Sequence, residues 1–108
     1  MDPRKRRAGY RGALTRHCAE LDEFIETADL AELSARLDAL TDTYAKISEL
    51  NDQVLDKLND EAEIEDECLE IFAREEEYFQ HCARLKAAID KLRGLHLVAT
   101  SVPTKEIL

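Results

Sequence analysis

The dipeptide His-Cys occurs twice, as His17-Cys18 and His81-Cys82. Two imidazoles and two thiolates form the ligand set of a tetrahedral zinc site when all four converge on one ion. Neighbouring residues on a helix point in different directions, however, so both members of a pair rarely reach the same ion. Both cysteines also occupy apolar positions of helical stripes, where cysteine usually acts as a small buried hydrophobe. We therefore interpret these residues as packing residues and expect no metal or cofactor, with a metal-responsive thiol module as the alternative.

Other catalytic constellations are missing from the sequence. A di-iron bundle needs Glu-x-x-His motifs, but Glu77 precedes His81 by four residues rather than three. There is no glycine-rich phosphate loop after a strand, and no Ser or Cys nucleophile has a recognisable partner. We predict that the protein is not an enzyme and has no small-molecule substrate.

The strongest periodic pattern runs from Ile64 to Leu92, where apolar residues recur at alternating steps of four and three with one charged interruption, Glu75. This is the 3.5-residue spacing of a coiled-coil seam. Leu69, Phe72 and Phe79 flank the seam and widen it to a face that can cover two neighbours. We predict a long helix that ends near Arg93, with Gly94 as its left-handed cap.

A second heptad pattern predicts a helix from about Leu30 to Asn59. Its one polar seam residue is Asn51, which either fixes register or oligomeric state or lies at the rim while Leu50 and Leu55 turn inward. Together the two patterns define an oligomer or packing seam: Leu33, Leu37, Leu40, Tyr44, Ile47, Asn51, Val54, Ile64, Cys68, Ile71, Tyr78, Cys82, Leu85 and Ile89.

Two capping signatures place the turns. Asp29 with Glu32, and Asp60 with Glu63, are acidic capping boxes that begin the second and third helices. We interpret the acidic residues 60–67 as ordinary charges at a helix N-terminus rather than as a calcium loop, because the central Gly of such a loop is absent. A shorter first helix begins between Ala8 and Leu14 and ends near Ala28. The prediction is an all-α fold of three antiparallel helices, a short first helix and two long coiled-coil-like ones, in residues 8–93.

The charges are unevenly distributed along the chain of 108 residues and net charge −9. Residues 17–93 hold 22 acidic and eight basic residues, which argues against a fold that binds nucleic acid as a whole. Residues 1–7 are predicted to be a disordered basic arm, and residues 94–108 an extended or disordered tail. The candidate RNA contacts are in the arm: Arg4, Lys5, Arg6 and Arg7.

Sequence features also predict the compartment. No apolar run approaches the ~20 residues of a membrane span, and no apolar segment of a secretory signal follows the basic residues. Three cysteines without a secretory signal suggest free thiols in a reducing compartment. We expect a cytoplasmic protein, with the nucleus as the alternative, and no membrane partner.

Several short sequence motifs resemble those of one known family. They are the basic lead RGALTR at residues 11–16, the apolar set Leu21, Phe24 and Ile25, the Leu- and Glu-rich residues 30–40, and an acidic run at 65–67 followed by a Tyr/Phe pair at 78–79. From Arg7 to Leu92 the sequence resembles the helical domain of unknown function in the Gag-like region of Pao/Bel-type LTR retrotransposon polyproteins. In that family a Pro-containing linker follows, to which residues 102–105 are similar.

The resemblance implies a structural segment of a retroelement Gag, or of a gene derived from one, without catalytic or metal residues. The expected function is self-association or docking to other Gag-like domains through the apolar stripes, with weak RNA contact through the arm. The alternative is a monomeric three-helix adaptor that binds another intracellular protein.

Overall fold

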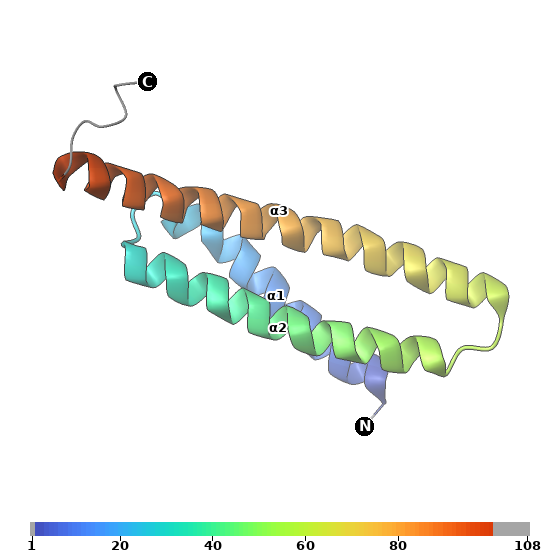
Figure 1. Ribbon diagram of the computed structural model, residues 1–108. Coiled ribbons are helices and arrows are strands. Elements are labelled where there is room, and N and C mark those ends of the chain that lie inside the picture. The colour runs from blue at the N-terminus through green and yellow to red at the C-terminus, as the bar shows by residue number, and fades with distance from the viewer. Residues whose placement is uncertain (1, 101–108) are drawn as a thin grey trace, which may run out of the picture.

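The protein is an elongated bundle of helices (Figure 1) with extents of 60 × 28 × 18 Å. The computed structural model describes the backbone of residues 2–100 and the side chains of residues 2–94. Within these residues the chain forms three helices, α1 (Pro3–Phe24), α2 (Leu30–Asp56) and α3 (Glu61–Thr100). Because α2 runs back along the bundle, α1 and α3 run in the same direction (Figure 1). The predicted all-α fold, with the first helix the shortest, is confirmed.

Both turns are made by the predicted caps. The Asp29 carboxylate accepts a hydrogen bond of 2.8 Å from the backbone N–H of Glu32, and Asp60 accepts one of 3.1 Å from Glu63. Each bond satisfies an N–H group that has no partner within its own helix. The positions of both turns are therefore set by the capping residues Asp29 and Asp60.

The start of α1 corrects the sequence prediction. Residues 1–7 were expected to be a disordered arm, but the helix begins at Pro3, with Asp2 as its N-cap accepting a 3.1 Å hydrogen bond from the N–H of Arg4. Proline is favoured at the first helical position because its φ is preset and its missing N–H would have no partner there. Arg7 is 5% exposed and held by partners on both other helices, which explains why this segment is ordered.

The end of α3 also differs from the prediction. The helix does not stop at Arg93 but continues to Thr100, and no glycine among the described residues has a positive φ. Gly94 is therefore a helical residue rather than a cap, at a cost of about 1 kcal/mol relative to Ala. Residues 101–108, the rest of the predicted tail, lie outside the described residues.

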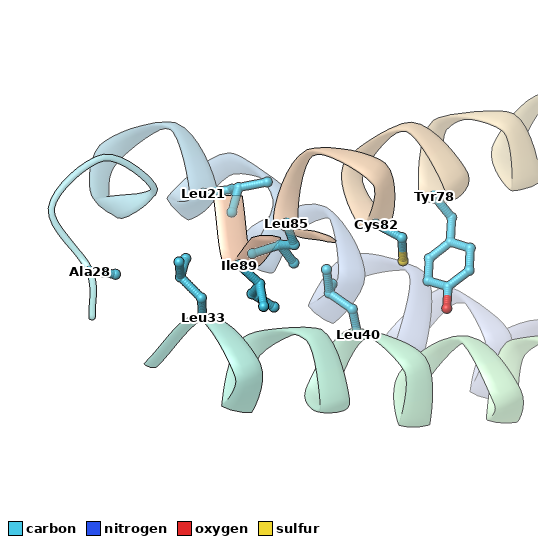
Figure 2. Close-up of a cluster of buried hydrophobic side chains, with 8 residues drawn as sticks. All are labelled: Leu21, Ala28, Leu33, Leu40, Tyr78, Cys82, Leu85 and Ile89. Carbon is cyan, nitrogen blue, oxygen red and sulfur yellow. The ribbon is translucent and has the colours of Figure 1, made fainter. Parts of the chain in front are cut away.

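The core extends along the bundle, where Ile47, Leu50, Val54 and Ile71 are also buried, and one cluster of it lies near the α1–α2 turn. Side chains from all three helices meet there (Figure 2), and Leu21, Leu33, Leu40 and Leu85 are each no more than 1% exposed. Truncating one such leucine to alanine costs about 2–5 kcal/mol in a typical core. The eight buried members of the cluster are Leu21, Ala28, Leu33, Leu40, Tyr78, Cys82, Leu85 and Ile89.

Candidate functional site

The residues of the predicted seam pack against one another inside the bundle. Of its fourteen residues, ten are buried and four are half-buried: Leu37, Tyr44, Ile64 and Cys68. Tyr44 and Tyr78 stack with ring centroids 4.0 Å apart and planes within 8°, and the Tyr44 hydroxyl donates to the carboxylate of Glu75. The charged interruption of the seam thus has a partner on α2. Any surface for another protein must be sought outside these residues.

A buried polar cluster joins the three helices. Arg7 of α1 donates to the side-chain oxygen of Asn51 on α2 at 2.9 Å and forms an ion pair with Glu67 of α3 at 2.9 Å. The three residues, which we call the Arg7 cluster, are 5%, 6% and 9% exposed. Asn51 is therefore buried rather than at the rim, and Leu50 is buried beside it. Glu67, interpreted from the sequence as an ordinary helix N-terminal charge, is in fact an interior ion-pair partner.

The burial of Arg7 changes the set of candidate RNA contacts. Arg7 is removed from the set because its guanidinium is enclosed and paired. The guanidinium of Arg4 lies 3.6 Å from the Glu67 carboxylate, but 54% of the Arg4 side chain is exposed. The cations that stay exposed at the start of α1 are Arg4, Lys5 and Arg6.

The two His-Cys pairs lie at similar heights on α1 and α3, but their imidazoles diverge. Cys18 and Cys82 both belong to the core region, whereas the His17 ring contacts Arg36 of α2 at 2.9 Å and His81 faces the space between α1 and α3. No group of three or more potential metal ligands occurs among the described residues. Burial, followed by the charges of Cys82 and Glu77, raises the pKa of Cys18 to about 11, which keeps it a neutral thiol.

A pocket of about 290 Å³ separates α1 from α3. Its existence follows from small side chains, because α1 presents Thr15, Cys18 and Ala19 to the gap, while the closest helix packing is α1 on α2 and α2 on α3. Tyr44 and Ile47 of α2 contribute to its lining, and Tyr78 and His81 line it from α3. We call this pocket the α1–α3 slot. Burial raises the pKa values of both tyrosines above their usual range, so their hydroxyls are neutral.

The slot is lined by two arginines, Arg11 and Arg74, and by two carboxylates, Asp22 and Glu77. Arg11 and Arg74 share one carboxylate, that of Glu70, at 3.9 and 2.8 Å. Burial, followed by repulsion from Arg7 and Arg74, lowers the pKa of Arg11 to about 10. Two guanidinium nitrogens of Arg11 and Nδ1 of His81 are buried without a hydrogen-bond partner within the described part of the chain. The sequence analysis did not identify this site. A signal was present, because Arg4, Arg7 and Arg11 share one face of the first helix and Glu67, Glu70 and Arg74 share one face of the third.

Three large apolar side chains are exposed on one side of α3. Leu69, Phe72 and Phe79 are 60%, 63% and 57% exposed. Steps of three and seven residues put these side chains on one side of the helix. We call this surface the α3 outer face. These residues are the ones that flank the seam in the sequence, and in the bundle each stays more than half exposed.

Comparison with protein-family models, curated proteins and solved structures finds no match for this chain. The similarity to the Gag-like family therefore stays a prediction from the sequence phrases. Within the described residues, none of the helices is both long and apolar enough to cross a bilayer.

Proposed function

We propose that the protein is a non-enzymatic helical assembly segment that self-associates through the α3 outer face. The observation that carries this proposal is the exposure of three large apolar side chains, Leu69, Phe72 and Phe79, on one side of α3. Burying a side chain of this size contributes about 1.5–3 kcal/mol relative to leaving it in water. The resemblance to a Pao/Bel-type Gag-like region, or a gene derived from one, supports the assembly context.

The spacing of the face suits a symmetric pair. In an antiparallel two-fold arrangement each residue i contacts j while j contacts i. An axis between Glu75 and Glu76 sets Phe72 opposite Phe79 of a second copy, so both aromatic pairs are covered at once. The same axis brings the exposed Glu76 carboxylates of the two copies close together, which limits the affinity.

Molar mass by light scattering over a hundredfold concentration range tests the proposal. We expect a dimer or larger species in the upper part of the range, and a shift toward monomer in Leu69→Ser and Phe72→Ser. Leu30→Ser is the matched control, because Leu30 is an exposed leucine on α2, 38% accessible. A wild-type chain that stays monomeric throughout would exclude self-association.

The second candidate is a monomeric adaptor that binds another protein through the same face. The acidic surroundings favour it, since Glu65, Asp66 and Glu76 are exposed on α3 and the chain carries a net charge of −9. Such a surface suits a basic amphipathic helix laid along α3. A monomer that binds a Leu/Lys amphipathic peptide, but not its Leu/Glu analogue, and loses binding in Phe72→Ser would establish the adaptor.

A further inference from the structure

We propose that Glu65 and Lys86 select the orientation in which two copies of this chain associate, because each forms an ion pair with the other on an antiparallel second copy. This inference rests on the proposed self-association through the α3 outer face. It adds the two charged residues that decide between an antiparallel and a parallel pair.

Four residues of α3 form a row with a step of seven residues: Glu65, Phe72, Phe79 and Lys86. Seven residues are close to two helical turns, so the row follows one side of the helix over about 32 Å. All four side chains are exposed, and α3 lies along one edge of the bundle (Figure 1). A second helix laid along this row would contact all four residues.

The row is complementary to itself under a two-fold axis. In chain order it is acidic, aromatic, aromatic and basic, and in the reverse order it is basic, aromatic, aromatic and acidic. The point midway between Phe72 and Phe79, where the proposed axis lies, is also midway between Glu65 and Lys86. One axis therefore forms both aromatic pairs and both Glu65–Lys86 pairs at once.

Both charged residues are available for a partner. Neither Glu65 nor Lys86 takes part in an ion pair within the described residues, although Lys86 borders a surface groove together with Asp38 and Asp90. A parallel pair in register would place each of the two opposite the same residue of the second copy, and like charges placed opposite each other are destabilising. The charges of the row therefore favour the antiparallel pair.

The two ion pairs act on orientation more than on affinity. Exposed ion pairs contribute little free energy, and two copies of net charge −9 repel each other. Glu76 lies near its own counterpart in both arrangements, so it does not distinguish them. The antiparallel register also sets Glu61 opposite Asp90, which are both acidic and exposed. The complementarity is thus confined to the four residues of the row.

Light scattering of charge variants tests the orientation. Lys86→Glu and Glu65→Lys each replace two ion pairs of the antiparallel pair with two like-charge contacts, and each should raise the dissociation constant about tenfold. The double variant Glu65→Lys, Lys86→Glu exchanges the charges and should return the constant to within about twofold of the wild-type value. In a parallel pair, none of these variants would change the number of like-charge contacts.

Two features separate specific pairing from general repulsion. Glu65→Lys makes the net charge of −9 two units less negative, so general repulsion alone predicts tighter association, whereas the ion pairs predict weaker association. Lys46→Glu is the matched control for Lys86→Glu, because Lys46 is exposed on α2 and lies beside α1. We expect Lys46→Glu to change the dissociation constant by about twofold or less. Circular dichroism checks that every variant keeps its helicity.

The outcomes distinguish this inference from the proposed function. A wild-type chain that stays monomeric throughout would exclude self-association and the ion pairs with it. A wild-type dimer that Glu65→Lys leaves unchanged or strengthens would overturn the antiparallel pairing alone. A double variant that stays as weak as the single variants would also overturn it, because exchanged charges are equally complementary.

Discussion

Arg7, Asn51 and Glu67 are the residues through which all three helices share one buried polar contact. Each residue comes from a different helix, and the two contacts to Arg7 are both 2.9 Å long. A buried ion pair contributes little net free energy relative to apolar residues of similar size. Removing one partner is costly, however, because it leaves an uncompensated charge in the interior.

Glu67→Ala should therefore lower the free energy of unfolding by about 3 kcal/mol or more. The double variant Arg7→Met, Glu67→Leu should recover most of that loss, since no buried charge is left. Glu70→Ala is the control, because Glu70 is exposed and its pairs should contribute less than about 1 kcal/mol. Urea denaturation measures the free energy of unfolding of these three variants. If the single and double variants were equally unstable, packing rather than charge would explain the effect of Glu67.

Cys18 should react slowly with thiol reagents. Because its pKa is raised to about 11, the thiolate that attacks iodoacetamide is scarce at pH 8. We expect the alkylation rate to rise as the pH passes through about 11 in the folded protein, and through a pH nearer to 8.5 in urea, where the thiol has its ordinary pKa. Peptide mass mapping distinguishes Cys18 from Cys68 and Cys82. Equal profiles in native and denaturing buffer would contradict the burial of Cys18.

At the scale of the helix, α1 and α3 show what local signals do and do not settle. Asp2 and Pro3 form a cap and a first helical position, yet the basic run and the glycines after them resemble a disordered segment when read alone. Gly94 has the residue type of a C-cap, yet it lies inside α3. In both places the helix is longer than the sequence predicts, because α1 includes the basic run and α3 continues past Gly94.

Gly94→Ala tests the helical assignment by the sign of its effect. A Cβ at this position would meet no atom within 4 Å, and alanine is favoured over glycine in a helix by about 1 kcal/mol. We expect the free energy of unfolding to rise by up to that amount, together with higher helicity by circular dichroism. A left-handed glycine cap would give the opposite result, because alanine is strained at positive φ.

At the scale of the whole molecule, the bundle leaves two surfaces without partners. The α1–α3 slot exists because α1 packs mainly on α2, while ion pairs such as Arg84–Asp22, at 2.6 Å, link α1 to α3 around its ends. The α3 outer face exists because α3 has a wide apolar stripe and the bundle covers only one side of it. The two surfaces are chemically different, so each can be altered without changing the other.

Self-association through the α3 outer face should strengthen with salt. Two copies of net charge −9 repel each other, and the exposed Glu76 side chains would lie near the two-fold axis. Raising the ionic strength from 0.01 to 0.15 M shortens the Debye length from about 30 to about 8 Å, which screens this repulsion. We expect the dissociation constant from light scattering to fall several-fold, and less so in Glu76→Gln. A constant that rises with salt would contradict association limited by this repulsion, because it would mean that opposite charges of the two copies attract each other.

The sequence by itself determined the helices and the turns between them. Heptad spacing identified nearly all of the residues that fill the interior, and the pairs Asp29/Glu32 and Asp60/Glu63 marked both turns. These signals are local, because a helix repeats every 3.6 residues and a cap bonds to a group three residues away.

Only the tertiary structure decided how polar residues from different helices are paired. Arg7 and Glu67 are sixty positions apart, and nothing in the neighbourhood of either residue shows that the other will neutralise it. The same holds for Arg11 and Arg74 at the end of the slot, and for the choice between a buried and a rim position for Asn51. Burial and charge pairing depend on the relative placement of the helices, which periodicity leaves open because it fixes only the face that each helix turns inward.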